Sequence, residues 1–167
     1  MVAPYIPENS DILDIGGYDG SFLTHMGDKI KRGVCVDPFI EEQKDDKIEF
    51  VRSRVTDKLP FSDDSFDAVT LMAVYEHLHG VREQITAEVF RVLRNRGYVL
   101  LTVPDAGIDH ILKLLLAMRL IDGMSTFEEH EHFNSKATVK IFNECGFRLT
   151  RWKKFQLGLN NLFIFQK

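Results

Sequence analysis

The sequence predicts an α/β protein: a doubly wound, mostly parallel sheet in a three-layer αβα arrangement. Short apolar runs typical of buried strands alternate along the chain with segments whose apolar residues recur at helical spacing. A glycine-rich turn joins the first of these runs to the first helical segment. The C-terminal region instead holds two strand patterns around a Gly-Leu-Asn-Asn turn, which predicts an antiparallel hairpin. A length of 167 residues fits a single domain, which we take as 1–167.

Composition and charge argue against several classes of protein. An apolar content of 44% and a charged content of 28% are ordinary for a soluble globular protein. The formal net charge of −4 and the lack of a basic stripe give no reason to expect a nucleic-acid partner. No apolar run approaches the ~20 residues of a membrane span, and no charged-then-apolar leader opens the chain. We therefore expect a cytoplasmic protein, with Cys35 and Cys145 as buried thiols because they lack metal-ligand spacing.

The first strand is predicted over the apolar run that ends at Ile15, and a helix is predicted to begin at Ser21. Between them lie three glycines, and after them Gly33 leads into a second strand over Val34–Val36. That strand ends in Asp37-Pro38. The apolar positions of the predicted helix are Phe22, Leu23, Met26 and Ile30.

The glycine turn is the first candidate site. The order strand, glycine turn, helix presents backbone N–H groups and a helix N-terminus to a nucleotide-like ligand. Gly16 and Gly20 permit positive φ and a close approach of the ligand to the backbone. A tight turn without a ligand is the alternative. The spacing is not the G-x-G-x-x-G of dinucleotide-binding folds, which disfavours a nicotinamide-dependent dehydrogenase.

Asp37 is the second candidate. It lies 17 residues after Gly20, at the end of the strand beside the glycine turn in a βαβ unit. A carboxylate at that place can accept both hydroxyls of a ribose. The alternative is an aspartate that caps a short helix over Ile40–Gln43.

The middle of the chain continues the alternation. Strands are predicted over Ile48–Val51, Asp67–Ala73 and Tyr98–Pro104. A helix between the last two is predicted from apolar residues at i, i+4, i+8 and i+11, and Gly97 is expected to end it. These apolar residues are Val81, Ile85, Val89 and Val92.

The C-terminal third opens with a segment, 108–121, that is apolar on nearly all sides and is predicted to be a helix. A polar loop follows it. Ser135 is expected to cap a helix that carries Ala137, Ile141 and Cys145 and ends at Gly146. The predicted hairpin strands are Phe147–Gln156 and Leu162–Gln166.

Three motifs resemble class I S-adenosylmethionine (SAM)-dependent methyltransferases. The run Asp14–Gly20 reads Asp-x-Gly-x-x-x-Gly and resembles their first motif, Asp/Glu-x-Gly-x-Gly-x-Gly, with Tyr18 in place of the central glycine. Leu59–Phe61 with Ser65–Asp67, and then Glu76–Leu78, are similar to later motifs of the family. The resemblance runs from residue 11 to 167 and implies a Rossmann-like sheet of seven strands.

The resemblance also implies the cofactor, SAM, with S-adenosylhomocysteine as its product. Asp14, Gly16 and Gly20 would hold the methionine part, and Asp37 would take the ribose. The family often has an aspartate near the adenine where this chain has Val55. The full set of implied cofactor residues is Asp14, Gly16, Gly17, Tyr18, Gly20, Asp37, Pro38, Val55 and Ala73. The Tyr18 ring would stand beside the cofactor or turn outward to solvent.

A proton acceptor is needed if the methyl acceptor is a hydroxyl or a neutral nitrogen. Tyr75 and His132 are the candidates, the first after the fourth predicted strand and the second in the polar loop. Glu76, His77, His79 and His130 lie near them. Stabilisation of the next helix is the alternative for Glu76 and His77, and a solvated loop is the alternative for the later histidines. No complete metal-ligand set is visible.

The segment 105–135 is interpreted as a lid or substrate-side insertion. Its apolar helix, 108–121, would contact an apolar small-molecule acceptor, pack in a homodimer, or simply belong to the core. A competing function is a non-catalytic methyltransferase-like module that binds SAM or serves as a partner subunit. Tyr18, Val55 and the short segment before Asp11 favour that alternative, whereas Asp14 and Asp37 favour the enzyme.

Overall fold

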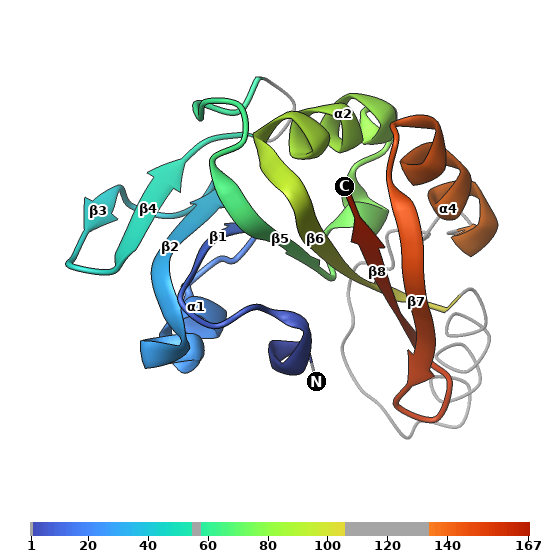
Figure 1. Cartoon of the computed structure of the whole chain (residues 1–167), viewed down its shortest axis with the longest axis horizontal. Coiled ribbons are helices and arrows are strands. Elements are labelled where there is room, and N and C mark those ends of the chain that lie inside the picture. Colours follow the sequence, from blue (N-terminus) through green and yellow to red (C-terminus); the bar gives the residue numbers. More distant parts are fainter. Residues whose placement is uncertain (1, 55–57, 106–133) are drawn as a thin grey trace, which may run out of the picture.

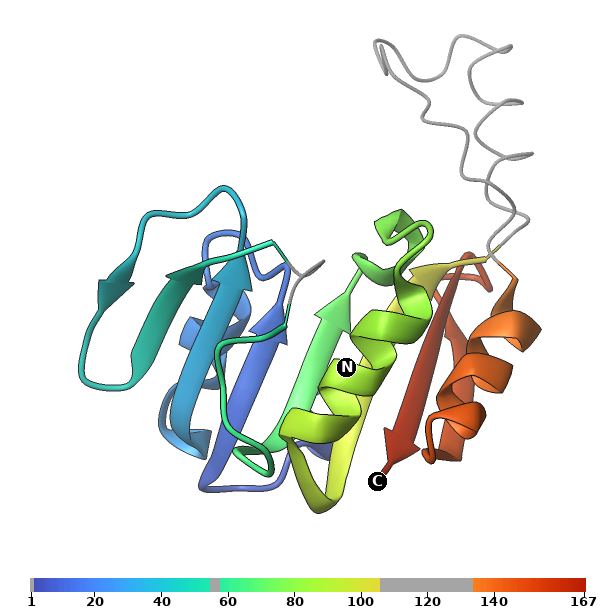
Figure 2. The same ribbon diagram turned by 90° about the horizontal axis from the view of Figure 1, so that it is seen from above.

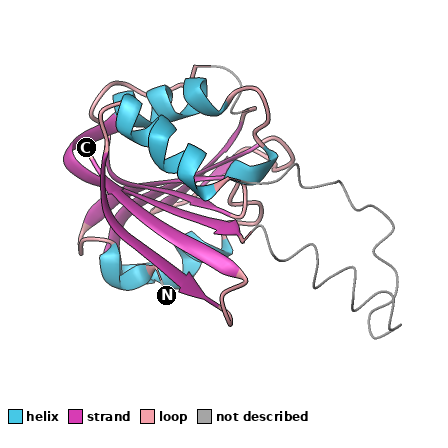
Figure 3. Ribbon diagram, turned by 90° about the vertical axis from the view of Figure 1, so that its right-hand side faces the viewer, coloured by secondary structure: helices cyan, strands magenta, loops and turns pink. Residues whose placement is uncertain are grey.

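A computed structural model describes residues 2–54, 58–105 and 134–167. Within these ranges the chain forms one eight-stranded sheet with helices on both faces (Figure 1, Figure 3). The strands are β1 (Ser10–Ile15), β2 (Ile30–Asp37), β3 (Gln43–Lys44), β4 (Ile48–Arg52), β5 (Phe66–Met72), β6 (Leu93–Pro104), β7 (Arg148–Phe155) and β8 (Asn160–Gln166). The α-helices are α1 (Ser21–Met26), α2 (Arg82–Val92) and α4 (Ser135–Glu144), and the 3-10 helices are η1 (Ala3–Tyr5), η2 (Gly27–Lys29) and η3 (Tyr75–His77).

The strand order, β3-β4-β2-β1-β5-β6-β8-β7, makes β1 the centre of the sheet. The chain runs outward from β1 to β2 and β4, then returns to the other side of β1 as β5 and β6, all in parallel. Ligands bind at such a switch point, beyond the carboxyl ends of the strands. This strand order and the antiparallel pairing of β6, β8 and β7 confirm the predicted doubly wound sheet with its C-terminal hairpin.

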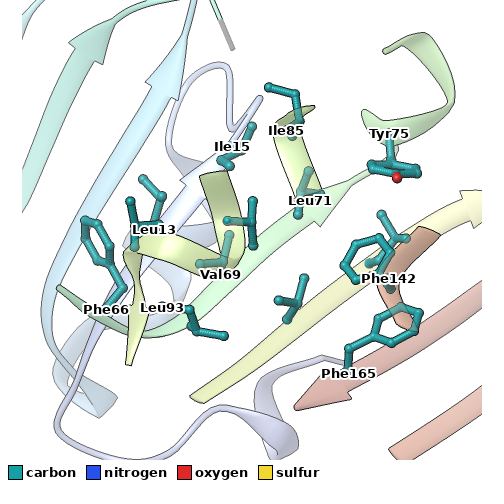
Figure 4. Close-up of a cluster of buried hydrophobic side chains, with 14 of the residues drawn as sticks. Leu13, Ile15, Phe66, Val69, Leu71, Tyr75, Ile85, Leu93, Phe142 and Phe165 are labelled. Atoms are coloured by element: carbon teal, nitrogen blue, oxygen red, sulfur yellow. The ribbon is translucent and has the colours of Figure 1, made fainter. Parts of the chain in front are cut away.

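Two apolar clusters fill the layers. Helices α2 and α4 cover one face of the sheet, while α1 and the N-terminal residues lie on the other (Figure 2). On the α2/α4 side, Phe142 of α4 stacks on Phe165 of β8 with ring centroids 4.1 Å apart (Figure 4). Every residue of β1 is buried, which explains why an apolar run without alternation marks this strand.

The structure corrects two predictions in the first half. Ile30 does not belong to the first helix: α1 ends at Met26 because Gly27 turns the chain with φ +51°, and Ile30 begins β2. The segment Ile40–Gln43 is not a helix. Its end forms the short strand β3, which pairs antiparallel with β4 and raises the strand number from seven to eight.

Two predicted caps also differ. Gly97 does not end α2: the helix stops at Val92, and Gly97 lies inside β6, where a side chain would meet the Asp67 carbonyl oxygen at 2.9 Å. The cap of α4 is Asn134 rather than Ser135. Its side-chain oxygen accepts hydrogen bonds from two backbone N–H groups of the first turn.

The predicted helix 108–121, most of the 105–135 insertion, and both His130 and His132 lie outside the described residues. Among the helices that the structure describes, none has the length and apolar character needed to cross a membrane.

Candidate functional site

The turn after β1 has an alternating backbone. Gly16, Tyr18 and Gly20 all take the left-handed conformation, with φ of +73°, +47° and +69°. Glycine adopts this conformation freely, whereas a tyrosine pays for it in backbone strain. The Tyr18 side chain is 67% exposed, so its ring faces solvent. The missing central glycine therefore leaves the path of the turn intact.

The turn is packed tightly onto the strand ends beneath it. A Cβ on Gly16 would stand 2.3 Å from a methyl of Val74, just beyond β5. A Cβ on Gly17 would stand 2.4 Å from Asp14 Oδ2 and 2.8 Å from Cys35 Sγ. All three distances are shorter than real contacts allow. The close approach, as much as the dihedral angles, requires glycine here.

Asp14 lies beneath this turn and is 1% exposed. Its Oδ1 accepts a 2.6 Å hydrogen bond from the buried hydroxyl of Thr70, while its Oδ2 has no partner among the described residues. Burial raises the pKa of Asp14 from 3.8 to about 7, and the nearby Asp37 carboxylate adds to the rise. A buried carboxylate with one unsatisfied oxygen fits a ligand that brings positive charge or N–H donors to the turn.

Asp37, 7% exposed, connects the turn to the end of β2. Its Oδ2 accepts from the backbone N–H of Tyr18 at 3.3 Å, and its Oδ1 accepts from that of Phe39 at 2.8 Å. Each carboxylate oxygen keeps capacity for a further hydrogen bond, so a ribose diol can still be received. The helix that Asp37 was expected to cap, as the alternative role, is absent from the described chain.

Among the remaining residues that the resemblance implies for the cofactor, the structure describes Pro38 and Ala73. Pro38 follows Asp37 and is half-buried. Ala73 is exposed after β5 and has φ +55°, and its N–H donates to the Thr102 carbonyl oxygen. The next residue, Val74, lies against Gly16. Val55 lies outside the described residues.

Tyr75 is held in the core rather than at the strand edge. Its side chain is fully buried against Phe142, and its hydroxyl lies 2.9 Å from the Thr86 hydroxyl (Figure 4). Burial raises the pKa of Tyr75 to about 12, which is unsuited to a proton acceptor near neutral pH. These contacts describe a packing residue and do not support the predicted catalytic role. His132, the other candidate, lies outside the described residues.

Thr70 is the site residue that sequence reasoning missed. It is fully buried in β5 and hydrogen-bonds the Asp14 carboxylate across the strand pair. The signal was available: Thr70 is the one hydroxyl within the apolar run from Ala68 to Ala73. Nothing in the sequence, however, tells which neighbouring strand carries its partner.

The Asp14 environment makes a prediction about stability and pH. The folded-state pKa lies above the ordinary value, so the folded protein holds a proton that the unfolded chain has already lost. Asp14 therefore makes the free energy of unfolding fall as pH rises from about 4 to about 7, by up to about 1.4 kcal/mol per pH unit. Asp14→Asn, which keeps an oxygen for Thr70, should remove this decline. Urea unfolding at pH 5 and pH 8 checks it; identical pH profiles for both proteins would contradict it.

The strand order places the glycine turn and Asp37 together at the sheet's switch point. Solved SAM-dependent methyltransferases share this fold. The family described as "Methyltransferase domain" matches residues 1–151, and the chain belongs to it. It is a SAM-dependent methyltransferase, and SAM is its cofactor.

Solved structures agree on the fold. A SAM-dependent methyltransferase of Methanosarcina mazei is 25% identical, with a TM-score of 0.71 over 99% of this chain and 96% of its own. A proposed methyltransferase of Bacillus halodurans is 17% identical, with a TM-score of 0.73 over 97% and 94%. Another, from a complex with the Haloferax volcanii Trm112 methyltransferase activator, is 15% identical, with a TM-score of 0.74 over 96% and 84%. A search of curated proteins gave no match.

Proposed function

We propose that this methyltransferase acts on a small-molecule acceptor and that its SAM site is formed by the glycine turn, Asp14 and Asp37. The observation that carries the site is the buried Asp14 carboxylate, whose Oδ2 has no partner in the described chain and lies directly beneath Gly17. Such an oxygen is costly unless a ligand compensates it. The turn above it leaves no room for a side chain.

The chain's own residues would divide the work of binding. Asp37 would accept the ribose hydroxyls while its bonds to the Tyr18 and Phe39 N–H groups keep the carboxylate in place. Asp14 would favour the cationic methionine end, and Thr70 would orient Asp14. Pro38 and Val55 would flank the adenine. When bound, SAM supplies an activated methyl group for in-line transfer, a reaction that depends mainly on alignment.

The proposal also assigns a proton acceptor and an acceptor pocket. His132 remains the candidate base, because the histidine side chain can exchange a proton near neutral pH. Segment 105–135 would contribute the acceptor side of the pocket, and its apolar composition favours an apolar acceptor. The same apolar segment, 108–121, which the sequence predicts to be a helix, is the proposed contact of a homodimer.

One observation supports the alternative function, a module that works with a partner subunit. One structural neighbour was solved in complex with the Trm112 methyltransferase activator. In this chain a partner of that kind would complete the site rather than replace its chemistry. The two functions differ in whether the chain alone transfers methyl groups.

Incubation with methyl-labelled SAM and a metabolite extract tests the proposed function. The purified chain should transfer label into the low-mass filtrate, and Asp37→Ala should strongly reduce the transfer at a SAM concentration below the dissociation constant. Label that enters only retained macromolecules would overturn the small-molecule acceptor. Binding of SAM without transfer to any fraction would favour the partner-dependent module.

A further inference from the structure

A concave surface lies on the sheet face opposite α2 and α4. It is a trough of about 520 Å³ between the N-terminal residues and the strands β6, β8 and β7. Ile164 forms part of its floor and belongs to the apolar cluster of the α1 side, whereas Phe165, its neighbour in β8, faces α4. Figure 3 shows the two helices on one side of these strands and the N-terminal segment on the other.

The trough is far from the glycine turn along the strands. Tyr98 and Gln166 pair across β6 and β8, and Tyr98 also pairs with Ala68 near the start of β5. The glycine turn follows the opposite, carboxyl end of the parallel strands. A ligand in the trough would therefore occupy a site separate from the one that binds SAM.

Two arginines give the trough its charge. Arg148 and Arg151 line the trough, and its lining contains no Asp or Glu. Neither arginine forms an ion pair within the described residues. In contrast, Arg91 and Arg94 each bond two carboxylates. Residues 134–167 hold seven Lys or Arg and a single Glu, although the whole chain carries −4. The overall charge thus conceals a basic C-terminal region.

Neighbouring side chains hold both guanidinium groups in place. Arg148 donates to Gln166 Oε1 at 2.7 Å, and the Gln166 amide lies 3.3 Å from the Tyr98 hydroxyl. Arg151 lies over the Tyr5 ring, 5.3 Å from its centroid. Because a guanidinium has five N–H donors, each arginine keeps donors for an anion. Two half-buried tyrosines, Tyr5 and Tyr98, supply aromatic surface beside them.

We propose that this trough binds a small aromatic anion: a flat ring that carries a phosphate or carboxylate group. Arg148 and Arg151 would bind the anion, and Tyr5 and Tyr98 would contact the ring. A volume of about 520 Å³ is in the range of small-molecule sites. An alternative explanation is that the arginines prevent aggregation, because β7 is an edge strand and charged side chains on such strands have that effect. Lys153 and Lys154 of β7 can serve this purpose without the arginines. The two arginines differ from these lysines because they line the trough together with two tyrosines.

Isothermal titration with uridine 5′-monophosphate and with phosphotyrosine tests the proposal. At least one probe should bind, and uridine and inorganic phosphate should each bind about tenfold more weakly, since the site uses both charge and ring. The double variant Arg148→Gln/Arg151→Gln should lose the binding while its melting temperature and SAM affinity stay unchanged. Lys136→Gln/Lys140→Gln, with the same change of charge on α4, should keep it.

Four results would overturn the proposal. They are the absence of binding for both probes, equal binding by both double variants, loss of probe binding in Asp37→Ala, and a single-stranded uridine octamer that binds far more tightly than the monophosphate. The third would place the probe in the SAM site, and the fourth would assign the trough to nucleic acid. If the trough does not bind its probes, the result of the SAM titration is unaffected, so the two sites are tested separately.

Discussion

Gly16→Ala is expected to destabilise the protein by about 3 kcal/mol. A left-handed backbone costs a non-glycine residue about 1–2 kcal/mol, and forcing extra atoms into a packed site costs about 1–3 kcal/mol. Gly16 meets both conditions, because its φ is +73° and its Cβ would stand 2.3 Å from a Val74 methyl. Urea unfolding measures the loss. The same variant should fail to bind SAM where it is still folded, since the collision displaces the turn.

Gly80→Ala is the matched control for this variant. Gly80 has φ +74°, nearly the same as Gly16, but a Cβ there meets nothing within 4 Å. It should therefore cost only the backbone part, about 1 kcal/mol. Shortening the neighbour, in Gly16→Ala/Val74→Ala, should recover part of the difference. Equal losses for Gly16→Ala and Gly80→Ala would show that the turn does not press on the end of β5.

Asp37→Ala is expected to weaken SAM binding by at least about tenfold, a loss of about 1.4 kcal/mol. The variant removes the ribose acceptor and also frees the Tyr18 N–H, which fixes the turn to the end of β2. S-adenosylhomocysteine should lose affinity equally, because it has the same ribose. Titration of both ligands into both proteins measures the effect.

Asp45→Ala controls for the loss of backbone capping alone. Asp45 also accepts two backbone N–H groups, from Lys47 and Ile48, but it lies in the turn between β3 and β4. The variant should bind SAM like the wild type. If Asp45→Ala weakens binding as much as Asp37→Ala, Asp37 acts only through the stability of its turn.

The fold could be predicted from the sequence where the signal is local. The strand before Gly16 and the acid after Val36 can be read from neighbouring residues, and the sheet confirms their arrangement. Their contacts could be expected as well, since adjacent parallel strands end at one edge. The roles of Asp14 and Asp37 toward SAM remain proposals.

Contacts between distant segments were beyond the sequence. Tyr75 was chosen for its position after a strand, but packing against Phe142 and the bond to Thr86 bury it. Thr70 became a site residue only through its place beside β1. The strand β3 could not be predicted because its two residues, both exposed, carry no periodic pattern.

Direct titration of SAM and of S-adenosylhomocysteine into the wild-type chain tests the central claim, that the glycine turn, Asp14 and Asp37 form a cofactor site. Both ligands should bind one site with dissociation constants in the micromolar range, about −8 kcal/mol. Because a cationic ligand favours the ionised form of Asp14, binding near pH 6 should also release protons, seen as a heat that depends on the buffer. A folded protein that binds neither ligand would contradict the account.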